Sequence, residues 1–171
     1  IIKNNGKITS ANNSEINVKE LINNNFIYSN NDLNIKSDLL SNIKNASIVA
    51  NNNLNVDVLN SDFINNGLLQ SNNKVLKIKT NNDLINNNII NSTNGNIVIE
   101  SKNIINNSII KALNNLEIIA INGEINNNDL LMSKNNSIVS KAKTLNNNSA
   151  IIYAGEDIDL IIDDTINNIN N

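Results

Sequence analysis

The stretch Leu84–Asn107, LINNNIINSTNGNIVIESKNIINN, contains one full unit of the pattern that decides the fold and the first residues of the next unit. It reads as an apolar residue, two asparagines, a short gap, Ile-x-Ser, a polar turn, Ile-x-Ile and a second polar turn that leads back to Ile-Asn-Asn. Almost every other part of the chain repeats this order. A fixed repeat of this kind indicates a solenoid or an array of units.

The repeat has a steady length of 19–21 residues. When the units are aligned on the second asparagine of each pair, the aligned positions are Asn5, Asn24, Asn45, Asn66, Asn87, Asn107, Asn127, Asn147 and Asn168. An apolar residue precedes the pair in every unit except the first, where Lys3 stands. Each unit therefore carries the same order of apolar and polar positions.

The apolar residues of each unit predict strands. Their spacing is two, as in Ile90-x-Ser92 and Ile97-x-Ile99, whereas a helix needs a spacing of 3.6. Isoleucine is β-branched and favours strands, and asparagine favours turns. We predict an all-β chain, a right-handed parallel β-helix of about eight coils that covers residues 1–171 as a single repeat segment. At ~4.8 Å per coil, the rod would be roughly 38 Å long.

The aligned asparagines are the candidate structural site. Stacked at the coil spacing, each side-chain amide can donate to the oxygen of the next, as in the Asn ladders of cross-β structures. We expect replacement of Asn66 or Asn87 by a bulky β-branched residue to destabilise the rod more than changes at Asn31 or Asn73 in the variable turns. The predicted ladder consists of Asn24, Asn45, Asn66, Asn87, Asn107, Asn127 and Asn147.

Charge and composition argue against several functions. The net charge is −3 and aromatics are 2 % of residues, so nucleic-acid binding is not expected. The apolar runs are too short to span a bilayer. Without histidine or cysteine there is no imidazole base, thiol nucleophile or zinc-type ligand set. We therefore predict no enzyme, no cofactor and no metal site.

One acidic segment, residues 156–164, leaves an alternative open. Asp157 and Asp159 flank Ile158 and would project outward from one strand, where a surface cation could bind. A solvated strand face is the simpler interpretation. The alternative function is a β-helical domain that binds or cleaves carbohydrate. A low-complexity region without a fold is a further alternative, which the steady repeat length disfavours.

The motifs Ile2-x-Asn4-x-Gly6-x-Ile8-x-Ser10 and Phe63-x-Asn65-x-Gly67-x-Leu69-x-Ser71 resemble the repeats of filamentous haemagglutinin-type exoproteins, which are exported by two-partner secretion. This family includes adhesins and contact-dependent growth-inhibition effectors. The resemblance implies an internal fragment of a longer exoprotein at the bacterial cell surface, exported through an outer-membrane transporter. It also implies a structural or adhesive rod that presents a binding tip or toxin and contacts a host or bacterial receptor.

Overall fold

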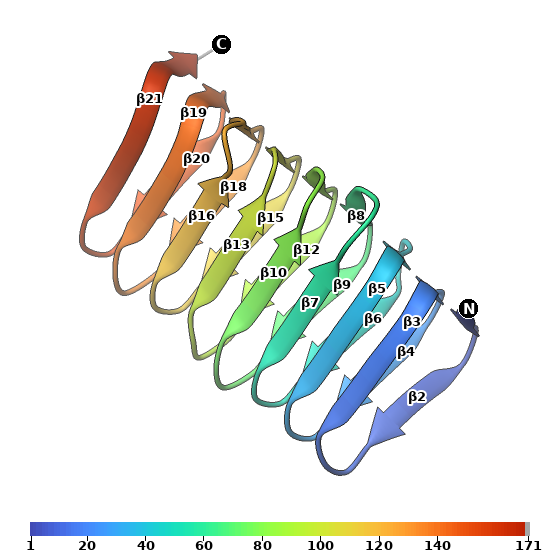
Figure 1. The fold of residues 1–171 in the computed structure, drawn as a ribbon. Coiled ribbons are helices and arrows are strands. Elements are labelled where there is room, and N and C mark those ends of the chain that lie inside the picture. Colours follow the sequence, from blue (N-terminus) through green and yellow to red (C-terminus); the bar gives the residue numbers. More distant parts are fainter. Residues whose placement is uncertain (170–171) are drawn as a thin grey trace.

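The computed structural model describes residues 1–169, and these contain strands but no helix. All strand pairings among them are parallel, and each coil of the chain stacks on the one before it (Figure 1). The chain is therefore an all-β parallel solenoid, as the spacing of its apolar residues predicted. The right-handed sense of the coil stays a prediction.

One sheet contains eight strands, one from each of eight coils. Each strand holds the Ile-x-Ser or equivalent motif, with its second and fourth residues directed into the core in the six inner coils. We number the coils 1 to 8 by these strands, which are β2 (Lys7–Ser10), β4 (Phe26–Ser29), β6 (Ser47–Ala50), β9 (Leu68–Ser71), β12 (Ile89–Ser92), β15 (Ile109–Ala112), β18 (Leu130–Ser133) and β20 (Ile151–Ala154).

The other sheet contains thirteen strands and forms the remaining sides of each coil. In the middle coils, bends such as residues 81–83 divide it into a longer and a shorter strand, since asparagine and aspartate favour turns. Its strands are β1 (Ile2–Asn4), β3 (Ser14–Asn23), β5 (Leu33–Asn42), β7 (Leu54–Val58), β8 (Phe63–Asn65), β10 (Leu76–Thr80), β11 (Leu84–Asn86), β13 (Ile97–Ser101), β14 (Ile104–Asn106), β16 (Leu116–Ala120), β17 (Glu124–Asn127), β19 (Ile138–Asn148) and β21 (Ile158–Ile169).

Equivalent residues stack in register through the solenoid. Ile90 pairs with Leu69 on one side and with Ile110 on the other, while Ser92 pairs with Ser71 and Ala112. A shift by one residue would turn every apolar side chain to the outside, so the buried rows fix the register. The large and small rows predicted from the sequence thus form continuous stripes.

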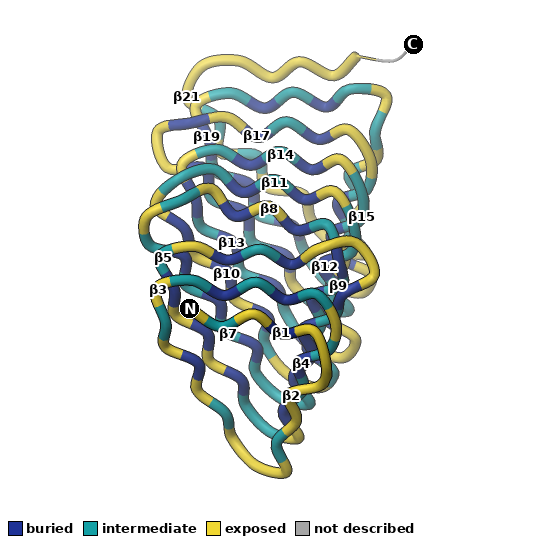
Figure 2. The backbone as a smooth tube through the Cα atoms, turned by 90° about the vertical axis from the view of Figure 1, so that its right-hand side faces the viewer, coloured by how far each residue is buried: buried dark blue, intermediate teal, exposed yellow. Residues whose placement is uncertain are grey.

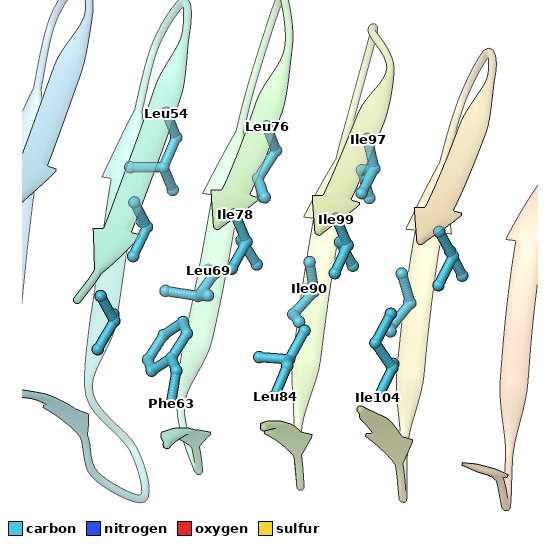
Figure 3. Packing of buried hydrophobic residues seen from close by; sticks show 14 of the residues in the cluster. Leu54, Phe63, Leu69, Leu76, Ile78, Leu84, Ile90, Ile97, Ile99 and Ile104 are labelled. Atoms are coloured by element: carbon cyan, nitrogen blue, oxygen red, sulfur yellow. The ribbon is translucent and has the colours of Figure 1, made fainter. Parts of the chain in front are cut away.

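The core lies between the two sheets and runs along the solenoid axis. Figure 2 shows the alternation of buried and more exposed residues along the strands of the inner coils. Figure 3 shows the buried aliphatic side chains repeating from coil to coil, with Phe63 among them. Phe63, Leu84, Ile90 and Ile97 are fully buried. In residues 1–169, two buried hydroxyls, those of Ser37 and Ser140, have no hydrogen-bond partner.

In the coils up to Ile105, the apolar residue immediately before the asparagine pair lies outside this core, whereas Ile125 and Leu145 in the last coils are buried in it. Ile64 is 40 % exposed and Ile85 is half-buried, whereas Phe63 and Leu84, one position earlier, are fully buried. In this short strand the burial alternates as buried, outward, buried, and the last buried position is an asparagine. The side of the coil that carries β8 and β11 therefore presents isoleucine to its outer surface.

Candidate functional site

A row of asparagines runs the length of the solenoid at the corner that leads into the eight-stranded sheet, and all its members are buried except Asn168 on the last strand. The Nδ2 of each residue donates to the Oδ1 of the next at 2.8–3.0 Å, without interruption from the first coil to the last. We call this row the inner ladder, and its members are Asn4, Asn23, Asn42, Asn65, Asn86, Asn106, Asn127, Asn147 and Asn168.

The inner-ladder amides from Asn4 to Asn147 also hold the backbone of the corner. Asn86 Nδ2 donates to Asn106 Oδ1 at 2.9 Å and to the carbonyl oxygen of Ile109 at 3.2 Å, at the start of the next coil's strand. The Oδ1 atom accepts too, as Asn65 Oδ1 does from Asn42 Nδ2 and from the backbone N of Gly67. Buried amide groups need such partners, because an unpaired one costs about 1–3 kcal/mol.

A second row of asparagines stacks on the outside of the same corner. Asn87 donates to Asn66 at 2.9 Å and accepts from Asn107 at 2.8 Å, and both bonds lie at the protein surface. We call this row the outer ladder. It consists of the pair Asn5 and Asn24, then, after a break, Asn66, Asn87, Asn107, Asn128 and Asn148.

The structure divides the predicted ladder between these two rows. The stacking of asparagines is shown, but the predicted row changes ladder along the chain. Asn127 and Asn147 belong to the inner ladder, Asn45 lies exposed and outside both, and the outer ladder contains Asn24, Asn66, Asn87 and Asn107. Apart from Asn45, the alignment on the second asparagine of each pair follows the outer ladder up to Asn107. After that residue it moves to the inner one, because Asn127 and Asn147 are each preceded by another asparagine and so become the second members of their pairs.

The lengths of the corners explain why the alignment of asparagine pairs did not select the inner ladder. In coil 4, Leu69 and Ser71 follow the inner asparagine Asn65 by four and six residues, and most corners share this spacing. Two corners are longer. The corner of coil 3 contains Asn45 at φ 68°, and the corner of coil 8 contains Ser149 at φ 50°. Such left-handed backbone is rare outside glycine and suits short turns.

The inner ladder therefore had a signal in the sequence. The spacing Asn-x-x-x-Ile-x-Ser identifies its members in six of the eight coils, with Leu for Ile or Ala for Ser in some of them, and the motifs Phe63–Ser71 and Ile2–Ser10 already contain it. Only the two longer corners interrupt the spacing. The alignment used the number of residues between neighbouring asparagine pairs. This number includes the extra residues of the longer corners, so it does not distinguish the two rows.

The outer surface of the longer strands is rich in charge, and we call it the charged face. Nine of its sixteen outward positions are lysine, aspartate or glutamate, with ion pairs at Lys79–Glu100 (3.3 Å) and Lys141–Glu117 (3.6 Å). These positions are Glu15, Asn17, Asn34, Lys36, Asn55, Asp57, Lys77, Lys79, Val98, Glu100, Glu117, Ile119, Val139, Lys141, Asp159 and Ile161.

The outer surface of the eight-stranded sheet has the opposite character, and we call it the neutral face. Only two of its sixteen outward positions, Lys7 and Lys111, carry a charge. It holds three of the four aromatic residues of the chain and its single methionine. The positions are Lys7, Thr9, Phe26, Tyr28, Ser47, Val49, Leu68, Gln70, Ile89, Asn91, Ile109, Lys111, Leu130, Met132, Ile151 and Tyr153.

The acidic segment lies on the last coil and is exposed. Asp157 and Asp159 flank the start of β21, and Asp163 and Asp164 follow along the same strand. Within residues 1–169, no three acidic, histidine or cysteine side chains gather in a way that could hold a metal ion. The described chain also has no helix of the length and hydropathy needed to cross a membrane.

Of the hollows on the described residues, two lie at irregular places of the solenoid. A hollow of about 390 Å³ lies at the last coils and is lined by core residues such as Leu145, Ile152 and Leu160. The other, of about 410 Å³, lies beside Lys44 in the long corner of coil 3 and next to Asn87 of the outer ladder. Neither contains a pair of acidic groups placed for acid–base chemistry.

Comparison with protein-family models, with curated protein sequences and with solved structures finds no match to this chain.

Proposed function

We propose that this chain is a rigid structural or adhesive segment of a secreted bacterial cell-surface protein, which holds a binding tip or a toxin away from the membrane. The observation that supports this best is the unbroken register of the eight-stranded sheet. Parallel pairing continues from β2 to β20 in one sheet, and the inner ladder continues from Asn4 to Asn168 beside it. The described coils therefore form one continuous stack.

The length of the solenoid follows from its repeat. Each coil adds ~4.8 Å, so the eight coils extend for about 38 Å. Length in a solenoid increases by adding coils, without any change to the core of each coil. A segment of this kind is suited to setting a distance between a membrane and a binding site. In the proposed setting the chain is exported through an outer-membrane transporter and contacts a host or bacterial receptor.

The rigidity can be tested by measuring distances along the charged face. Glu15 and Asp159 lie in one stacked row on coils 1 and 8, and the chain has no cysteine of its own. A Glu15→Cys/Asp159→Cys variant carrying spin labels should show a narrow distance distribution near ~34 Å, which is seven coil spacings. The Glu15→Cys/Glu117→Cys pair is the control and should give ~24 Å, or five spacings. A broad distribution for the longer pair would contradict a rigid rod.

The location can be tested independently of rigidity. Antibodies raised against the chain should label intact cells of the bacterium that encodes it, and lysis should increase the labelling little. Labelling that appears only after lysis would contradict a surface protein. The adhesive role predicts that fluorescent beads coated with the chain bind to receptor-bearing cells and that free chain competes for this binding. Beads that bind no better than albumin-coated beads would leave only the role of a stalk.

The alternative function is a β-helical domain that binds or cleaves carbohydrate. Its test is incubation of the chain with neutral and acidic polysaccharides, followed by measurement of new reducing ends. We prefer the rod because the acidic side chains of β21 lie along one exposed strand of the last coil. An acid-lined groove between coils, as the alternative requires, is not formed by the described residues.

A further inference from the structure

We propose that the neutral face is a self-association surface, on which a second copy of this chain packs side by side to form a weak antiparallel dimer. Each of the two broad outer surfaces of the solenoid is a row of parallel strands with sixteen outward positions, so the two are built alike. They differ in charge. Nine of these positions are charged on one surface and two on the other.

The composition of the neutral face is typical of an interface core. Such cores are enriched in aromatic residues and methionine and depleted of lysine, aspartate and glutamate. Phe26 and Tyr28 stack here with ring centroids 6.0 Å apart, and Met132 and Tyr153 pair at the other end of the same surface. Phe63 is the one aromatic residue that the core uses. The remaining three are all placed on this surface.

An aliphatic row runs along this face, next to the corner with the asparagine ladders. Leu68, Ile89, Ile109 and Leu130 follow one another in four successive coils, and each is half-buried by its neighbours. The row therefore repeats at the coil spacing of ~4.8 Å. A second copy carries a row with the same spacing, so its ridges and grooves match over many coils at once.

The size of the face sets the strength of the contact. Eight strands at ~4.8 Å and four residues at ~3.3 Å give a surface of about 38 by 13 Å, or roughly 500 Å² from each copy. The total of about 1,000 Å² is at the lower limit for a specific interface. We therefore expect a reversible dimer with a dissociation constant in the micromolar range or weaker.

The arrangement follows from the positions of the rows. A twofold axis in the plane of the face and perpendicular to the rod places the aliphatic row of one copy on the aliphatic row of the other. Coil 4 then faces coil 5, so Leu68 lies opposite the second copy's Ile89. Lys7 and Lys111 lie in different rows and coils, and neither faces another lysine. Two aligned sheets pack with a small angle between their strands, so the contact is closest near this centre.

Sedimentation velocity over concentrations from ~1 µM to ~1 mM, the range of a weak interface, tests the dimer. The wild-type chain should change from monomer to dimer over this range. Ile89→Lys/Ile109→Lys should weaken dimerisation at least tenfold, since it places two charges in the aliphatic row. The control is Val98→Lys/Val139→Lys on the charged face, where the residues are equally half-buried, and it should dimerise like wild type. Circular dichroism melts confirm that both variants are folded.

Three results would overturn the proposal. The first is a wild-type chain that stays monomeric at the highest concentration. The second is equal weakening of dimerisation by Ile89→Lys/Ile109→Lys and by the control variant. The third is self-association that Ile89→Lys/Ile109→Lys does not weaken. The third result would show that the chains associate through the ends of the solenoid. Mixing Leu68→Cys and Ile89→Cys chains tests the orientation, and this mixture should form disulfide dimers faster than Leu68→Cys alone. Equal rates would overturn the antiparallel arrangement. The spin-label test of rigidity, which belongs to the proposed function, is independent of all these results.

Discussion

Asn86 and Asn87 are the same amino acid at adjacent positions, yet they have opposite environments. Asn86 is fully buried and has hydrogen bonds to Asn65, Asn106 and the carbonyl of Ile109. Asn87 stacks in the outer ladder, where water can replace either partner. The free energy that a side chain contributes here depends on which side of the corner it occupies, because only buried partners stay unpaired after its removal.

The two ladders should therefore respond differently to alanine. We expect Asn86→Ala to lower the unfolding free energy by about 2–4 kcal/mol, since it leaves buried amide and carbonyl groups without partners. Asn87→Ala should cost about 0.5 kcal/mol or less, as is usual for a surface site, because Asn87 is exposed like Asn73. The larger loss that the sequence predicted at Asn66 and Asn87 therefore belongs to the inner ladder. Thermal melts followed by circular dichroism would show a fall of roughly 5–15 °C for the first variant and little change for the second. Similar melting temperatures would contradict the assignment of the inner ladder.

At the scale of one element, the corner before the eight-stranded sheet has a standard length and two exceptions. The corner of coil 3 contains two additional residues, Lys44 and Asn45, which project from the surface while Ala46 stays buried. The backbone N of Ala46 donates to the carbonyl of Ile43 at 3.0 Å and closes the projecting turn. The insertion is thus accommodated outside the stack, and the strands on both sides keep their register.

Deletion of Lys44 and Asn45 should consequently be tolerated. It leaves three residues between the positions of Asn42 and Ile48, as in most corners, and removes a residue with left-handed backbone. We expect the unfolding free energy to change by about 1 kcal/mol or less.

The matched control is deletion of Asn87 and Asn88 from a corner of standard length. This deletion brings Asn86 next to Ile89 and prevents the corner from closing, so we expect a loss of several kcal/mol or failure to fold. Urea unfolding of the two deletion variants beside the wild type measures both effects. An equal loss in the two variants would show that the Lys44 turn supports the stack rather than projecting from it.

For the whole molecule, each coil contacts only the coils next to it, so the two end coils have one neighbour and the inner coils have two. The end strands show this in their burial. β21 has mostly exposed residues, and Ile158 and Ile166 are each more than 40 % exposed, whereas the equivalent residues of the inner coils are buried. Stability should therefore decrease from the centre of the solenoid toward both ends.

Hydrogen exchange followed by mass spectrometry can measure this gradient. We expect the slowest exchange in the strands of coils 4 and 5, such as β9, β12 and β13, and the fastest in β2 and β21. Protection in the centre should exceed that at the ends by at least about 2 kcal/mol, because an end coil lacks one of its two stacking interfaces. Uniform protection along the chain would indicate that the solenoid unfolds as one unit.

Much of this architecture was predictable because its signals are local and repeated. The spacing of two in Ile97-x-Ile99 predicts a strand in any single unit, and the unit length places equivalent strands next to one another. The stacking of asparagines follows from the same repeat. The pairs of adjacent asparagines do not show which of the two rows is buried. Asn86 and Asn87 are chemically identical, and they differ only in the direction in which the corner points their side chains.

By itself, the sequence determined the parallel solenoid, the number of coils, and the existence of stacked asparagines, since all of these depend on the period and the alternation of residues. Only the tertiary structure decided that the inner ladder runs from Asn4 to Asn168 and that the extra residues at Asn45 and Ser149 project from the corners. It also decided that charge gathers on one outer face and the aromatic residues on the other. These features depend on which side of the sheet each residue occupies, and that side is fixed by register with the neighbouring coils.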